Sequence, residues 1–209
     1  MDDLTAPLLH ALASPQTSAA YDFRESRVLI ARTLRQRILP VLAVLPSSFR
    51  TIPVNVHQLA DYWQVPLDYT RLPPSLSGFT LWTDAQHPVI AVNRQHPPVR
   101  QRFTIAHELT HIKIHGPRGV LLRQLTPHHL SPDMMLMELE ANTGAAEILL
   151  PRSQFLRQCR AWASQRPWTQ TLWDDWNAQA AALWAQQAHV SVAVIRYQLQ
   201  STPYYPHLS

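Results

Sequence analysis

The chain has 209 residues, of which 46% are hydrophobic and 15% are charged. This balance is typical of a globular protein with one well-packed domain and room for a small appended unit, and it excludes a disordered chain. The net charge of +4 is modest and the basic residues are scattered, so the charge alone does not indicate nucleic-acid binding.

Targeting and redox features point to the cytoplasm. The first ten residues, MDDLTAPLLH, lack the basic and apolar regions of a signal peptide. The longest apolar run, residues 38–46, is too short to cross a bilayer and contains prolines. The single cysteine, Cys159, cannot form an internal disulfide and is expected to serve packing. We therefore expect a cytoplasmic protein without a membrane partner.

The first half of the chain alternates helical and strand patterns. Apolar residues at helical spacing predict helices over residues 21–39 and 55–64. Alternating patterns and turn signals then predict three short strands over residues 65–72, 77–82 and 88–93. These strands indicate one small sheet.

Two well-marked helices follow the strands. Pro97 and Pro98 favour a helix start, and Gly116 followed by a proline favours its end, which predicts a helix of about five turns. Ser131 is a typical N-cap for the next helix, which Pro151 ends. The tail from residue 152 has a helical composition.

The motif H-E-x-x-H lies inside the first of these two helices, at His107, Glu108 and His111. With 11 His and 5 Glu in the chain, roughly 0.01 chance occurrences are expected. Residues four apart share a helix face, so both imidazoles can bind one metal ion. Glu108 is rotated by about 100° from His107 and can reach a metal-bound water. The pattern predicts a metal site with Glu108 as the general base.

The third metal ligand has three candidates. His115 lies about 12 Å from His107 along the helix axis, which is too far to share one ion. Glu138 and Glu140 lie on the following helix, about 200° apart around its axis, so only one of them can face the ion.

Glu138 is the favoured ligand of the two. Its helix face carries small residues, which permit close approach of the first helix, and Asn142, which could hydrogen-bond a ligand. Glu140 lies on the other side, where we expect a solvated face. We therefore predict that Glu138 binds the metal.

The stretch RFTIAHELTHIKIHG (102–116), followed by ELEANTGAAEILLP (138–151), resembles the ImmA/IrrE family of bacterial HExxH metallopeptidases. The likeness covers roughly residues 50–151. It implies that His107, His111 and Glu138 are ligands of Zn²⁺, with Mn²⁺ as the alternative ion, and that Glu108 is the general base. Two positions differ from the family pattern: Thr110 stands where Gly is common, and Gly144 stands where an aromatic residue is common.

The resemblance also implies a fold and a function. We expect an α+β fold in which a small mixed sheet packs on the active-site helices in a zincin-like manner. The metallopeptidase domain is expected over residues 1–151 and a helical, helix-turn-helix-like subdomain over 152–209. The expected function is site-specific cleavage of a bacterial helix-turn-helix repressor, which would derepress a stress or mobile-element response. The alternative is a DNA-binding regulator with a non-catalytic metal site.

The C-terminal residues 181–199 follow the spacing of a helix-turn-helix. Ala185, Val190 and Ile195 occupy the buried positions, and His189 stands in place of the turn glycine. Because the second helix offers only Arg196 as a base-reading cation, we favour helical packing over DNA binding.

The strand at residues 88–93 comes just before the motif helix and suggests how substrate is held. In proteases built on such a helix, a neighbouring edge strand commonly receives the substrate as an added antiparallel strand. We therefore predict that Val89, Ile90, Ala91 and Val92 bind an extended substrate segment.

Overall fold

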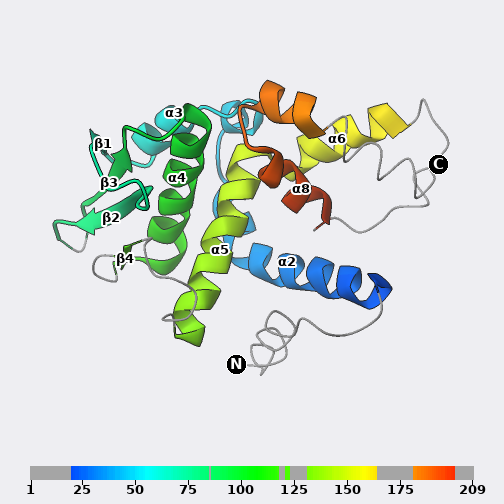
Figure 1. The fold of residues 1–209 in the computed structure, drawn as a ribbon, viewed down its shortest axis with the longest axis horizontal. Helices are drawn as coiled ribbons and strands as arrows, with labels where there is room; N and C mark the ends of the chain where they lie inside the picture. The colour runs from blue at the N-terminus through cyan, green and yellow to red at the C-terminus, as the bar shows by residue number, and fades with distance from the viewer. Residues whose placement is uncertain (1–19, 85, 118–120, 123–130, 164–180, 201–209) are drawn as a thin grey trace.

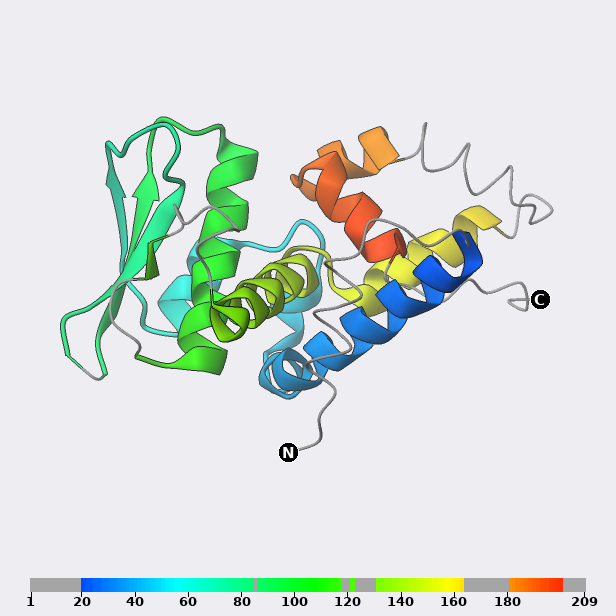
Figure 2. The same ribbon diagram turned by 60° about the horizontal axis from the view of Figure 1, so that its bottom comes forward.

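The protein is described by a computed structural model that covers residues 20–84, 86–117, 121–122, 131–163 and 181–200. The labelled elements in chain order are α2 (Ala20–Ala43), η1 (Ser47–Arg50), α3 (Val56–Tyr62), β1 (Leu67–Thr70), β2 (Gly78–Trp82), β3 (Pro88–Asn93), α4 (Pro98–Thr110), η2 (His111–His115), β4 (Leu121–Leu122), α5 (Pro132–Leu149), α6 (Arg152–Ala163) and α8 (Val192–Gln200). Figures 1 and 2 show the sheet on one side, α4 and α5 next to it, and α2, α6 and α8 beyond α5. The fold is therefore α+β with a small mixed sheet, as predicted.

The sheet has four strands in the order β1-β3-β2-β4. The first two neighbours, β1 and β3, are parallel, while β2 is antiparallel to both β3 and β4. The very short β4 pairs only with Phe79 and Thr80 of β2. The three strands expected from the sequence are all present, and β3 has the predicted bounds.

The position of β3 corrects the prediction for substrate binding. Residues 88–93 form an interior strand whose two edges are occupied by β1 and β2. Its backbone donors and acceptors are therefore not available to an added strand, and the prediction that Val89, Ile90, Ala91 and Val92 receive substrate is wrong. The apolar run of β3 fits a strand that is covered on both faces.

The motif helix α4 lies between the sheet and α5. All residues from Thr104 to Thr110 are buried. The hydroxyls of Thr104 and Thr110 donate to the carbonyls of Arg100 and Ala106, four residues earlier, so these polar groups are satisfied inside the core. The last turn of the predicted five-turn helix, His111–His115, is a π-helix that ends at Gly116, whose φ is 66°.

Helix α5 begins and ends where its signals predict. The Ser131 side chain accepts a hydrogen bond from the Met134 N–H, and the helix ends before Pro151. The contact with α4 is tight at Gly144, where an added Cβ would lie 2.3 Å from Thr110 Cγ2. The two departures from the family pattern are therefore in contact, and a larger residue on α4 meets a smaller one on α5.

Two C-terminal helices are separated by a turn, at the positions that the spacing of residues 181–199 predicted. Residues 181–188 are helical, the chain turns at His189 with a left-handed φ of 53°, and α8 follows. Ala185, Val190 and Ile195 are all buried. The remaining residues of the tail, 164–180 and 201–209, lie outside the described ranges. Among the described helices, none combines the length and hydropathy that crossing a membrane requires.

Candidate metal centre

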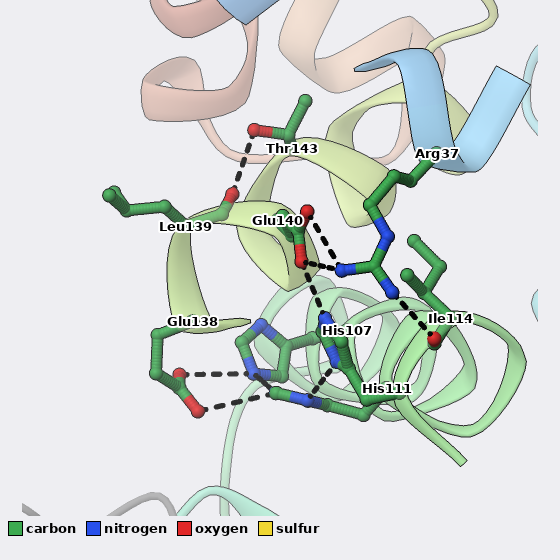
Figure 3. A network of polar contacts seen from close by, with 9 residues as sticks. Arg37, His107, His111, Ile114, Glu138, Leu139, Glu140 and Thr143 are labelled. Atoms are coloured by element: carbon green, nitrogen blue, oxygen red, sulfur yellow. Dashed lines mark hydrogen bonds and ion pairs between the residues drawn. The ribbon is translucent and has the colours of Figure 1, made fainter. Parts of the chain in front are cut away.

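Three side chains, from α4, the π-helix and α5, converge where α4 meets the π-helix. The Nε2 atoms of His107 and His111 lie 3.0 Å apart. Glu138 of α5 faces both of them, with Oε2 3.3 Å from His107 Nε2 and Oε1 3.2 Å from His111 Nε2 (Figure 3). In the described part of the chain, this is the single group of His, Cys, Asp or Glu side chains arranged to hold a metal ion.

A tetrahedral zinc ion fits this triangle of ligand atoms. Bonds of about 2.0–2.1 Å from the ion to each ligand would place neighbouring ligand atoms about 3.3 Å apart, close to the distances observed here. The side chains of His107 and His111 are 1% and 4% exposed, whereas Glu138 is 28% exposed. The three residues would therefore hold the ion and leave a position on the solvent side for water or substrate.

The electrostatics of Glu138 suit a metal ligand. Burial alone would raise the pKa of Glu138, but hydrogen bonds from His107 and His111, together with their charge, hold this pKa far below its ordinary value. The carboxylate is therefore ionised at neutral pH, which is the state that binds a metal.

Asn142 lies where it was expected, beside a metal-facing histidine. Its Oδ1 is 3.1 Å from Nδ1 of His107, one helical turn from Glu138 on α5. When His107 binds a metal through Nε2, its Nδ1 carries the proton and donates to this oxygen. The contact therefore fixes both the orientation and the tautomer of His107.

Glu108 is buried and is held by a residue that sequence reasoning missed. Its Oε2 accepts a hydrogen bond of 2.8 Å from Oγ1 of Thr80, in β2. Both residues are at most 3% exposed. The available signal was a hydroxyl residue within the apolar strand GFTLW. The sheet thus orients the predicted general base.

The prediction that Glu140 lies on a solvated face is wrong. Its side chain is 5% exposed and its two oxygens accept hydrogen bonds of 3.1 and 2.8 Å from Nη1 of Arg37, in α2. Its Oε2 is also 2.8 Å from Nε2 of His115. The helix side that was expected to face water is covered by α2, as Figures 1 and 2 show.

His115 is separated from the metal-facing cluster by His111. The Nδ1 atoms of His111 and His115 are 2.9 Å apart. Burial lowers the pKa of His115, although the hydrogen bond to Glu140 acts in the opposite direction. Burial would raise the pKa of Glu140, but the contacts with His115 and Arg37 lower it overall. A neutral imidazole therefore lies against a carboxylate that is paired with an arginine.

Comparison with known proteins identifies the family to which the chain belongs. The profile of the IrrE N-terminal-like domain, Peptidase_M78, matches residues 52–200. The radiation response metalloprotease IrrE of Deinococcus deserti is 37% identical over 68 residues, which are 32% of this chain and 24% of the relative. The match thus spans about a quarter of the relative's length. Because the profile covers most of the chain and includes every residue of the metal centre, the chain belongs to the ImmA/IrrE family, defined by the IrrE N-terminal-like domain.

Proposed function

We propose that this chain is a metal-dependent endopeptidase whose ion is bound by His107, His111 and Glu138. The observation that carries the proposal is the convergence of these three ligand atoms, with Glu108 next to His107 in the chain and buried at the sheet. A zincin-like arrangement, with the motif helix packed on a sheet and the third ligand on the next helix, belongs to the same proposal. Zn²⁺ suits the donor set, and Mn²⁺ is the alternative ion.

Each residue of the site has its own role in the proposed hydrolysis of a peptide bond. A metal ion bound at the three ligands would lower the pKa of a water molecule and polarise the scissile carbonyl. Glu108 accepts the proton of the attacking water and delivers it to the leaving amine. Thr80 holds the carboxylate of Glu108, and Asn142 holds the ring of His107.

The rival function is a DNA-binding regulator with a structural metal. A structural zinc site is normally closed by four protein ligands, usually with cysteine among them, whereas the described part of the chain supplies three ligands here, one of which, Glu138, is 28% exposed. The second helix of the helix-turn-helix, α8, directs Gln198 inward, where it bonds to Arg35 and to the carbonyls of Ala146 and Leu150. These contacts favour packing as the role of α8.

The proposed substrate class is a bacterial helix-turn-helix repressor, cut at one site to release a stress or mobile-element response. The family membership and the relative named as a radiation response metalloprotease support this choice. An enzyme of this kind would spare an unrelated unfolded protein, whereas a protease of broad specificity would digest it.

The experiment is cleavage of a helix-turn-helix repressor encoded beside the gene, using zinc-loaded wild type and Glu108→Gln. The amide cannot accept the proton of the water, so we expect cleavage to fall roughly 10²–10⁴-fold while metal content and thermal stability are retained. Asp61→Asn, which changes an exposed carboxylate in α3 to an amide, is the matched control and should cut like wild type. A Glu108→Gln protein that cuts at nearly the wild-type rate would remove the mechanism.

A further inference from the structure

A chain of four buried or half-buried polar side chains leads away from the metal centre, on the side opposite to Glu138. Nε2 of His111 points toward the other proposed metal ligands, and its Nδ1 lies 2.9 Å from Nδ1 of His115. His115 Nε2 is 2.8 Å from Glu140 Oε2, and Arg37 contacts both oxygens of Glu140. Arg37 also donates to the carbonyl of Ile114 at 3.1 Å, which ties the arginine to the π-helix (Figure 3).

The chemistry of imidazole sets the direction of every hydrogen bond in this chain. A histidine that binds a metal through Nε2 carries its proton on Nδ1. Nδ1 of His111 therefore donates, and Nδ1 of His115 accepts. The proton of His115 is then on Nε2, where it points to the carboxylate of Glu140. Donors and acceptors match at each step, and the charge of Glu140 is balanced by Arg37.

The location of these residues indicates more than general packing. Ligating histidines usually donate their second ring N–H directly to a carboxylate or a carbonyl. Here an imidazole stands between the ligand and the carboxylate, and it comes from the π-helix His111–His115. Short π-helical segments are rare and frequently occur at functional sites.

We propose that His115 and Glu140, with Arg37 behind them, are positioning residues that hold His111 in the tautomer and orientation required to bind the metal. This inference rests on the proposed function in one respect, that His111 is a metal ligand. The inference gives a role to three residues that take no part in the hydrolytic mechanism itself. It also explains why Glu140, two residues after Glu138, is buried on the other side of α5.

The test is the zinc dissociation constant of the full chain, measured by competition with a chromogenic chelator. Removing an outer hydrogen-bond partner of a ligating histidine typically weakens metal binding 10–100-fold. We expect a loss in this range for His115→Phe and a smaller loss, on the order of several-fold, for Glu140→Gln and Arg37→Met. The visible spectrum of the Co²⁺-substituted protein should shift in the same variants, because it reports the geometry of the ligands.

Glu147→Gln is the matched control. Glu147 is also a buried carboxylate of α5 that pairs with an arginine of α2, Arg35, and it accepts a second hydrogen bond from Gln198 of α8. The Glu147→Gln substitution should lower the midpoint temperature of thermal unfolding and leave zinc affinity and the Co²⁺ spectrum unchanged. Each titration is made at a temperature where circular dichroism shows the variant to be folded. Arg37 is half exposed, so Arg37→Met tests the same chain of contacts without opening the core.

The outcomes separate this inference from the proposed function. If wild type binds one zinc ion per chain and His115→Phe, Glu140→Gln and Arg37→Met bind it equally tightly with the same Co²⁺ spectrum, the positioning role is overturned and the peptidase proposal stands. The positioning role is also overturned if Glu147→Gln weakens zinc binding as much as Glu140→Gln does. A wild-type protein that binds no zinc would overturn both.

Discussion

The hydrogen bond from Thr80 to Glu108 gives the first prediction at the scale of single residues. Hydrogen bonds to a charged group contribute about 1.5–3 kcal/mol, and 1.4 kcal/mol corresponds to a factor of ten in rate. Thr80→Val removes the donor and keeps the shape, so we expect kcat to fall roughly 10- to 100-fold while metal content is unchanged. Cleavage of the proposed repressor substrate and metal analysis of the purified variant measure this.

Thr83→Val serves as the control for that substitution. Thr83 is an exposed residue whose hydroxyl donates to the carbonyl of His87, away from the site. If Thr80→Val and Thr83→Val cut repressor equally fast, the hydroxyl of Thr80 does not orient Glu108.

Residue-scale reasoning from the sequence identified the three converging side chains and did not identify their surroundings. Helical spacing places His107 and His111 on one face, the small residues and Asn142 beside Glu138 favour it over Glu140, and the structure brings the three predicted ligands together. The arginine that pairs with Glu140 could not be predicted from the sequence, because Arg37 lies 103 positions earlier in the chain. Helical periodicity reports which residues share a face and carries no information on what covers that face.

At the scale of elements, the contact between α4 and α5 depends on Gly144. An added Cβ would lie 2.3 Å from Cγ2 and 2.5 Å from Oγ1 of Thr110, on a buried and β-branched side chain. Ala is favoured over Gly inside a helix by up to about 1 kcal/mol, but overpacking costs about 1–3 kcal/mol. We expect Gly144→Ala to lower the free energy of unfolding by about 1–2 kcal/mol and to weaken zinc binding, since the two helices carry the ligands.

Urea denaturation measures this stability, and a second variant identifies the cause. Thr110→Ala removes the two nearest atoms, Cγ2 and Oγ1, so the double variant with Gly144→Ala should be more stable than Gly144→Ala alone. Should Gly144→Ala by itself raise the free energy of unfolding, helix propensity outweighs the contact and the close packing does not limit this interface.

The sequence predicted where elements begin and end better than it predicted which elements lie beside one another. The predicted strand over residues 88–93 has the same bounds as β3, and the ends of α5 match those predicted from Ser131 and Pro151. The order of strands was not predictable, because it is decided by pairings such as Leu67 with Ile90 and Gly78 with Val92. The unbroken apolar run in PVIAV was the one local sign of an interior strand.

At the scale of the whole molecule, polar contacts join α8 and the turn before it to α2, α4 and α5. Arg35 of α2 pairs with Glu147 of α5, and both bond to Gln198 of α8. On the other side, Arg102 of α4 donates to the carbonyl of His189 in the turn before α8. The predicted division into residues 1–151 and 152–209 stays a prediction.

The central claim is that one metal ion is bound by His107, His111 and Glu138, and metal analysis of purified protein tests it most directly. The measurement is the number of zinc ions per chain after reconstitution and removal of free metal, in wild type, Glu138→Gln and the exposed control Asp61→Asn. We predict one ion per chain in wild type and in Asp61→Asn, and a near-complete loss in Glu138→Gln, because the amide lacks the charge that the third ligand supplies. A wild-type chain without zinc, or a Glu138→Gln chain that retains a full equivalent as tightly as wild type does, would contradict the claim.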